Sequence, residues 1–217
     1  MKNWLNKELL LAKQSELLII YKELENIVSI PVDLSSSEGQ SWVRAISYRI
    51  VQEMVEAYEG NPNEPVVPEL IDCLFYYLEL ILLTDLQADM LEWEEDIDYT
   101  EKIESRVGWN DVFWGTTVEI GRLNHLLRKR EWREEGSDLD TEIFSAYMRR
   151  IWNCLVRFFS LLKIHPKEIE RLYLEKWEIN LNRAMISRQE KTTSNLITPL
   201  RRSSNSEEKE RKLQKFP

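Results

Sequence analysis

Helix-breaking residues are scarce in this chain of 217 residues, which contains only 6 glycines and 7 prolines. Their scarcity argues against a fold built on many tight turns, and the long charged and apolar stretches favour an all-α protein. Cysteine is scarce as well, and two cysteines cannot build a disulfide framework. With no signal-like N-terminus, the sequence predicts a protein of the reducing cytoplasm.

Positive charge and long apolar runs are also lacking. The formal net charge of −9 argues against a general nucleic-acid-binding protein, because phosphate contacts need a basic surface. The longest apolar run extends from Leu70 to Leu83 and contains Asp72 and Glu79, so it is too short and too polar for a membrane span of about 18–20 residues. We therefore expect neither a membrane nor a specific nucleic acid as a partner.

Apolar residues at helical spacing are abundant, in a chain that is 43% hydrophobic. The spacing predicts helices over residues 4–28, 41–59, 66–86, 111–132, 141–163 and 166–187, with an acidic helix or connector over 91–104. The short segment GNPNEP, residues 60–65, separates the second predicted helix from the third. Those two helices should therefore pack against each other as an antiparallel pair.

The composition changes near residue 188. Residues 188–217 contain eight Lys or Arg, four Glu and few apolar side chains, so they carry about +4 and leave about −13 on the rest. We predict one all-α domain over residues 1–187 and a disordered basic tail over residues 188–217. The tail is either simply solvated or makes an electrostatic contact with nucleic acid or with the acidic body.

The third predicted helix contains a carboxylate that needs a partner. Twelve of the fourteen residues from Leu70 to Leu83 are apolar or aromatic, so most faces of this helix should be buried. Asp72 lies inside the run, where an unpartnered charge costs several kcal/mol or takes up a proton. Glu69 precedes it by three residues and shares its face of the helix. Two acids on one buried face repel each other unless a cation joins them.

The second predicted helix offers two more acids at the same spacing, Glu53 and Glu56. In an antiparallel pair, the four carboxylates Glu53, Glu56, Glu69 and Asp72 would converge. Oxygen ligands of this kind suit Mg²⁺ or Mn²⁺ and not Zn²⁺. The alternative is a solvated acidic face, because 38 of the residues are Asp or Glu and such pairs also arise by chance.

The second half of the chain resembles the first with the acids exchanged. At an offset of 81 residues, Cys73 aligns with Cys154, Asp72 with Asn153 and Glu69 with Arg150. At an offset of 66, Glu53 aligns with Glu119 and Glu56 with Arg122. The pattern predicts two helical hairpins of common shape, of which only the first keeps four acids. Chance similarity between amphipathic helices is the alternative.

The ExxE and ExxD motifs on consecutive helices resemble those of the MazG-like and dimeric dUTPase superfamily of all-α nucleoside triphosphate pyrophosphohydrolases. A second segment, YLEKWEINLNR at 173–183, resembles the dimeric dUTPase signature Y-x-x-K-N-x-x-N-x-x-R-Q. The matching positions are Tyr173, Lys176, Asn180 and Arg183. Trp177 stands where the family has Asn, and Ala184 where it has Gln, so the preferred base stays open. Gln14 is a candidate for reading that base.

The resemblance implies a bundle of two repeated antiparallel helix pairs with flanking helices, and a homodimer. It implies hydrolysis of a dNTP, dUTP first, to dNMP and pyrophosphate. The four carboxylates would hold Mg²⁺, with Glu53 orienting the attacking water. Lys176 and Arg183 would bind phosphate, and Asn180 and Tyr173 the deoxyribose or a phosphate. For Tyr173 the alternative is packing in an interface, and for Lys176 and Arg183 it is a solvated helix face.

Two other functions remain open from the sequence. One is a dCTP or broad dNTP pyrophosphatase on the same site. The other, from a different class, is a non-catalytic helical interaction protein that retains the fold, for example an adaptor that uses the basic tail.

Overall fold

The computed structural model describes residues 5–25, 27, 29–59, 66–86, 88–92, 106–128 and 139–213. Within these ranges the chain is helical and contains no strand, which confirms the predicted all-α class. In chain order the elements are α1 (Lys7–Glu25), α2 (Ser37–Glu59), α3 (Val67–Leu83), the short 3-10 helix η1 (Ala88–Leu91), α4 (Arg106–Leu126), α5 (Thr141–Leu161) and α6 (Pro166–Leu213). No helix of the described ranges is both long enough and apolar enough to cross a membrane.

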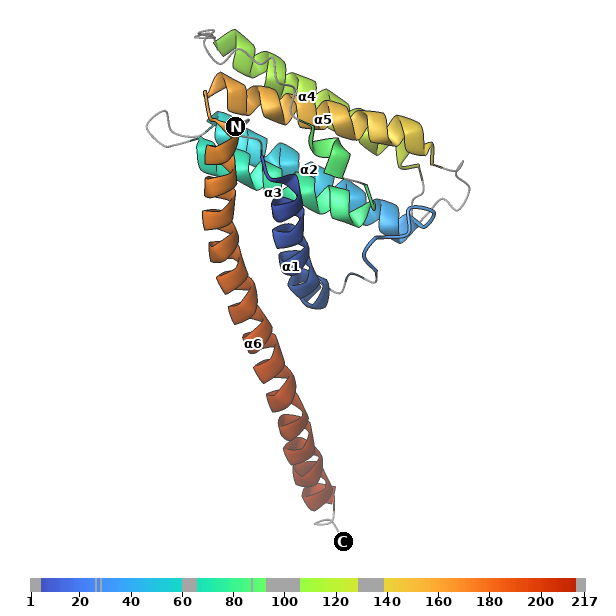
Figure 1. The fold of residues 1–217 in the computed structure, drawn as a ribbon. Helices are drawn as coiled ribbons and strands as arrows, with labels where there is room; N and C mark the ends of the chain where they lie inside the picture. The colour runs from blue at the N-terminus through green and yellow to red at the C-terminus, as the bar shows by residue number, and fades with distance from the viewer. Residues whose placement is uncertain are drawn as a thin grey trace.

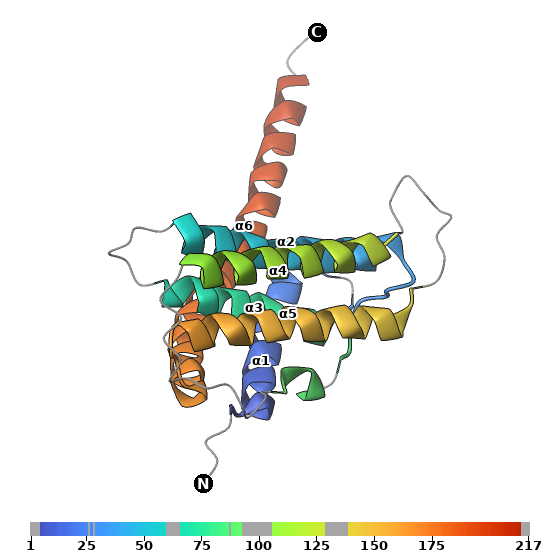
Figure 2. The ribbon, with the colours of Figure 1, turned by 90° about the horizontal axis from the view of Figure 1, so that it is seen from above.

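Helices α2 to α5 lie side by side as two hairpins, and α1 and α6 cross them (Figures 1 and 2). α2 packs on α3 and α4 packs on α5, while α2 also contacts α4 and α3 also contacts α5. Between α2 and α4, the Ser47 hydroxyl donates to the Asn124 side chain at 3.1 Å, and the Arg44 guanidinium donates to the Leu127 carbonyl at 3.0 Å. The predicted packing of the second helix on the third is confirmed.

α3 is the central helix, because it contacts α1, α2, α5 and α6. Its apolar residues are buried on almost every side, as the sequence predicts. On the α5 side, the Tyr77 hydroxyl donates to the Met148 carbonyl at 3.0 Å, and the Tyr77 ring stacks on Trp152 with 5.5 Å between centroids. A polar side chain on α3 is therefore in surroundings where it needs a hydrogen-bonding or charged partner.

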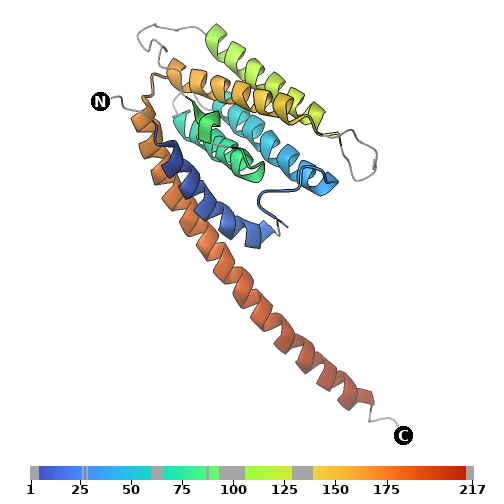
Figure 3. The same ribbon diagram turned by 45° about the vertical axis from the view of Figure 1, so that its right-hand side comes forward.

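α6 packs along α1, although the two helices are about 160 residues apart in sequence (Figure 3). The Trp177 indole donates to the Lys13 carbonyl at 2.8 Å, and the Lys13 ammonium lies 4.1 Å from the centre of the Trp177 ring. One turn earlier, the Tyr173 hydroxyl donates to Gln14 at 2.8 Å. These contacts fix the rotation of α6 about its axis, so that Lys176 faces α3.

α2 begins four residues before the start predicted at residue 41, so the end of the loop expected over 31–40 is helical. The reason is a cap, since the Ser36 hydroxyl accepts the Gly39 amide at 2.9 Å. Gly39 lies in the first turn and has no room for a side chain, because a Cβ there would be 2.1 Å from the Asp33 carbonyl oxygen. A glycine that indicates a loop in the sequence is required here by close backbone contact.

The other boundaries differ mainly at α4 and α6. Both ends of α4 lie five or six residues before the predicted bounds of 111–132. α6 begins at Pro166 as predicted but continues beyond Ser187, so the backbone of 188–213 is helical where the sequence predicts a disordered tail. That stretch contains no glycine and many Glu, Lys and Arg, which favour helix, and it extends away from the bundle (Figure 1). The domain division at 187 stays a prediction, and most of 91–104 lies outside the described residues.

The two glycines Gly39 and Gly121 give a matched test of this fold. Gly39→Ala should destabilise the protein by roughly 1–3 kcal/mol, because the new methyl group overlaps the Asp33 backbone. Gly121→Ala in α4 should stabilise by about 0.5–1 kcal/mol, since a Cβ there meets nothing within 4 Å and alanine favours helix. Urea unfolding followed by circular dichroism measures both. Equal effects of the two substitutions would contradict the close contact at Gly39.

Candidate metal and nucleotide site

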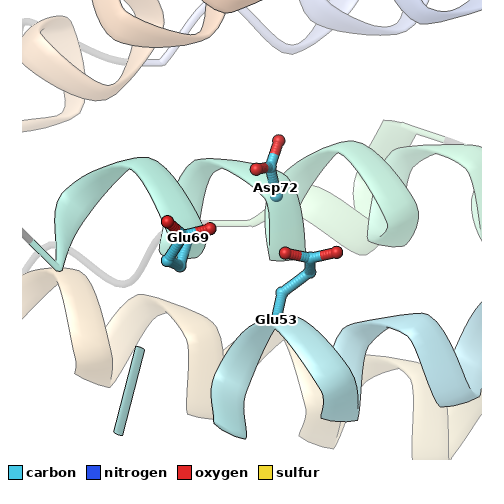
Figure 4. Close-up of side chains that lie close together, drawn as sticks. All are labelled: Glu53, Glu69 and Asp72. Atoms are coloured by element: carbon cyan, nitrogen blue, oxygen red, sulfur yellow. The ribbon is translucent and has the colours of Figure 1, made fainter. Parts of the chain in front are cut away.

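Three carboxylates from two helices converge where α2 packs on α3. Glu53 extends from α2 toward Glu69 and Asp72 on α3 (Figure 4). One oxygen from each of the three lies within 4.8 Å of the others, and all three side chains are partly buried. The helical hairpin explains the convergence, because Glu69 and Asp72 are three residues apart and so occupy one face of α3.

The electrostatics of this cluster favour a bound cation. Burial first, and then the charges of Asp72, Glu56 and Glu69, raise the pKa of Glu53 to about 7, against the opposing effect of Lys176. Burial also raises the pKa of Asp72, although its hydrogen bond with Lys176 acts in the other direction. The cluster therefore gains free energy from any positive charge placed among its oxygens.

Glu56 is the member of the predicted tetrad that the structure does not place in the converging group. It lies on α2 one turn after Glu53, and its side chain is exposed. It is still close enough for its charge to raise the pKa of Glu53 and of Asp72. The predicted spacing thus brings three acids together and leaves the fourth at the solvent-facing edge of the cluster.

Lys176 of α6 contributes a positive charge to the cluster. Its ammonium donates to Asp72 Oδ2 at 2.6 Å, and both side chains are largely buried. Arg183, two turns further along α6, is exposed, yet its charge also lowers the pKa of Asp72. The two cations predicted from the late motif therefore lie on the side of α6 that faces the carboxylates, and neither is remote from them.

A cavity of about 300 Å³ opens beside Asp72. It is lined by side chains of α1, α2, α3 and α6, namely Gln14, Leu17, Tyr21, Trp42, Ala45, Ile46, Arg49, Asp72, Phe75, Tyr76, Glu79 and Asn180. Asn180 and Gln14, both candidates from the sequence, are among them. Aliphatic and aromatic side chains share its walls with charged and amide groups, so the cavity can contact both the apolar and the polar parts of a small molecule.

Tyr173 does not line this cavity. Its side chain is fully buried, its ring stacks on Phe75 at 4.2 Å between centroids, and its hydroxyl donates to Gln14. Burial raises its pKa well above the usual range for tyrosine. The structure thus places Tyr173 in the packing position that the sequence leaves as the alternative, with Gln14 between its hydroxyl and the cavity.

Several residues of the cavity were not identified from the sequence. Tyr76 and Glu79 follow Asp72 by four and seven residues, so they continue the stripe on α3 that starts at Glu69. That spacing was visible in the sequence and could have indicated them. Trp42 and Arg49 of α2 also line the cavity, and no comparable pattern marks them, because their position depends on how α1 and α6 cover the hairpin.

The second hairpin has an ion-pair cluster at the positions that align with the acids. Glu119 of α4 accepts from Arg122 at 2.6 Å and lies 3.7 Å from Arg150 of α5. Among the described residues, Glu119 Oε2 is a buried side-chain oxygen with no hydrogen-bond donor. The carboxylate in this hairpin is therefore compensated by two guanidinium groups, which stand where Glu56 and Glu69 stand in the first.

The two cysteines are also placed alike. The Cys73 thiol is 3.6 Å from the Ile50 carbonyl of α2, and Cys154 hydrogen-bonds Thr116 of α4. The offsets of 81 and 66 residues that align the two cysteines and the two Glu also align Ile50 with Thr116. Burial raises the pKa of both thiols, so both act as small core side chains and not as nucleophiles.

Comparison of the chain with protein-family models, with curated proteins and with solved structures finds no match.

Metal binding should depend on pH through Glu53. Because its pKa is about 7 in the folded protein and near 4.5 unfolded, its contribution to stability is present at low pH and lost as pH rises through 4.5–7. Mg²⁺ should restore that stability by binding the ionised form. We expect Mg²⁺ to raise Tm by roughly 2–4 °C or more at pH 8, which corresponds to about 1 kcal/mol, and by much less at pH 5.5.

The measurement is thermal unfolding with EDTA or with Mg²⁺ at both pH values. Glu53→Gln should remove the Mg²⁺-induced increase at pH 8. Glu119→Gln, at the aligned position of the second hairpin, is the matched control and should keep it. A Tm increase of the same size at both pH values, or one that survives Glu53→Gln, would rule out this cluster as the cation site.

Proposed function

We propose that this chain is a Mg²⁺-dependent hydrolase that converts a deoxynucleoside triphosphate to the monophosphate and pyrophosphate, as the resemblance to the dUTPase-like superfamily implies. The observation that carries the proposal is the position of Asp72. This residue belongs to the converging carboxylates and also lines the cavity, so a cation site and a nucleoside-sized cavity share one side chain.

The donor set fits the proposed ion. Glu53, Glu69 and Asp72 offer only oxygen ligands, as Mg²⁺ and Mn²⁺ prefer, and they approach each other from two rigid helices. Glu56, at the exposed edge, would bind through a water or a second ion. When bound, Mg²⁺ neutralises phosphate oxygens and the charge that develops as the phosphoryl group is transferred.

The protein's own groups would carry the remaining steps. Glu53, one of the converging carboxylates, would take a proton from the attacking water as general base. The water oxygen bonds to one of the two phosphorus atoms that flank the α–β bridging oxygen, and the bond from that phosphorus to the bridging oxygen breaks. The bridging oxygen stays with the group that leaves, and in either case the products are the monophosphate and pyrophosphate. Lys176 and Arg183 lie beside Asp72 and would bind the triphosphate. Asn180 lines the cavity and would contact the sugar.

The second hairpin supports the proposal that the bundle is a duplicated helix pair. The aligned cysteines each contact the aligned residue of their neighbouring helix, Cys73 through the Ile50 backbone carbonyl and Cys154 through the Thr116 side chain, as a duplicated pair would place them. In this interpretation Arg122 and Arg150 replace the cation that the first hairpin binds. One metal site per chain follows.

Turnover is the direct test of the proposed function. The full-length chain with Mg²⁺ should release pyrophosphate and a monophosphate from at least one dNTP in a panel of four plus dUTP, measured by chromatography. Asp72→Asn and Glu53→Gln should each lower kcat by about 10²–10⁴-fold, because they remove a ligand or the base. The Glu119→Gln variant, once circular dichroism has shown that it is folded, should retain activity. No turnover of any nucleotide by the folded protein would favour the non-catalytic interaction protein instead.

We also propose that the chain forms a homodimer through the outer face of α2 and α4. Four large apolar side chains are exposed there, Tyr48, Tyr58, Trp114 and Val118. Tyr58 of α2 and Trp114 of α4 both contact the ring of Phe113, so apolar side chains of the two helices meet on this face. Exposed apolar patches of this kind are typical of protein interfaces, and Gly121 on the same helix leaves space for close approach.

Sedimentation at micromolar concentration should show a dimer. Trp114→Glu should convert it to a monomer without loss of helicity, because a charge would be buried at the interface. Ile143→Glu, at an exposed apolar position of α5, is the control and should leave the dimer intact. A wild-type monomer at that concentration would contradict the proposed dimer.

A further inference from the structure

The cavity beside the carboxylates has a second acid, Glu79, whose place is not explained by metal binding. Glu79 is only 8% exposed. It follows Asp72 by seven residues, which is two helical turns, so the two acids share a face of α3 about 10 Å apart. Because both line the cavity, the cavity extends along α3 from the carboxylate cluster to Glu79.

The walls between these two acids are aromatic. Trp42, Phe75 and Tyr76 line the cavity together with Tyr21. Flat aromatic side chains provide stacking surfaces for a nucleobase, and such stacking does not depend on which base is bound. The aromatic walls therefore account for binding a base, and the choice of base depends on the polar side chains of the lining, which are Gln14, Arg49, Glu79 and Asn180 beyond Asp72.

Gln14 is one of those polar groups and its orientation is determined by Tyr173. Its side chain is 2% exposed, and its Oε1 accepts the Tyr173 hydroxyl at 2.8 Å. Because the carbonyl oxygen accepts from Tyr173, the NH₂ group is the part of the Gln14 amide that can donate to a ligand in the cavity it lines. Tyr173, although buried, thus acts as a positioning residue for Gln14.

Glu79 is the complementary acceptor. A carboxylate accepts about four hydrogen bonds, so it can take a donor from a ligand in addition to its contacts within the protein. In a pyrimidine nucleotide the substituent at C4 lies across the ring from the sugar, and so is the part of the base farthest from the phosphates. With the phosphates at Asp72, that substituent is directed toward Glu79.

We propose, on the basis of the triphosphate hydrolysis inferred above, that Glu79 and Gln14 select a base with an exocyclic amino group, and that the substrate is a cytosine nucleotide. The N4 amino group of cytosine donates to the Glu79 carboxylate, a pairing that proteins use to recognise cytosine. The Gln14 amide donates to N3 or O2 of the same base. Uracil instead presents its O4 carbonyl to Glu79, and two oxygens without a proton between them repel.

The size of the cavity favours a pyrimidine over adenine, which also has an amino group. About 300 Å³ is at the lower end of the range for small-molecule sites. The cavity therefore favours dCTP as the preferred substrate, whereas the family resemblance favours dUTP first. The difference between the two expectations depends on a single carboxylate.

The test compares kcat/KM for dCTP and dUTP with the full chain and Mg²⁺. Wild type should prefer dCTP by at least 10-fold, because a site built to bond an amino group leaves polar groups unpaired with the wrong base. Glu79→Gln should lower kcat/KM for dCTP by roughly 10²-fold and change that for dUTP little or upward. Glu69→Gln, which alters a metal ligand, is the control and should lower both substrates without changing their ratio.

Binding of the products gives a readout that needs no turnover. Calorimetry with dCMP and dUMP should show tighter binding of dCMP to wild type, and Glu79→Gln should reduce that difference. Hydrolysis with a preference for dUTP would overturn the role of Glu79 and leave the proposed hydrolase intact. No hydrolysis, together with tighter dCMP binding, would overturn the hydrolase and support the base selection. Equal binding of dCMP and dUMP by wild type would overturn the base selection whatever the turnover.

Discussion

A carboxylate on a helix that is buried on nearly every side must be compensated by positive charge, and this constraint organises the molecule around Asp72. α3 supplies the core, and partial burial raises the pKa of Asp72, so its charged form needs a partner. Lys176 provides the compensation at 2.6 Å, and it does so from a helix more than 100 residues away in sequence. The packing of Tyr173 and Trp177 against α1 brings Lys176 to that position. The fold and the site therefore depend on the same interface.

The two hairpins meet this constraint in different ways. In the first, three acids converge beside Lys176, and burial together with the neighbouring acids raises the pKa of Glu53 to about 7. In the second, Glu119 is the one acid at the aligned positions and two arginines stand beside it. A hairpin whose own arginines neutralise its carboxylate needs no bound ion. In a hairpin with an excess of acids, the carboxylates repel each other when ionised, and a bound cation removes that repulsion. The contrast supports a specific role for the acids of the first hairpin, beyond general surface charge.

The sequence was sufficient for features that depend on local spacing. The apolar run around Asp72 predicted a buried helix, the short segment before it predicted the hairpin, and the three-residue spacings predicted the convergence of Glu53, Glu69 and Asp72. The sequence was insufficient for features that depend on packing between helices far apart in the chain. The exposure of Glu56, the burial of Tyr173 and the cavity all depend on where α1 and α6 cover the hairpin. The start of α2 was missed for a different reason, because Gly39 is required by contact with Asp33 and not by a turn.

One stripe of α3 connects these observations. Glu69, Asp72, Tyr76 and Glu79 follow each other at spacings of three and four residues, so a single helix face carries the proposed metal ligands at one end and the carboxylate proposed to contact the base at the other. A helix is a rigid spacer, and packing on all other sides keeps it from shifting. The distance from the proposed cation to the proposed base contact is therefore fixed by a buried helix and not by a loop. If the proposal is right, substitution at Glu79 should alter the choice of base, while the phosphate chemistry proposed at Asp72, two turns away, should stay in place.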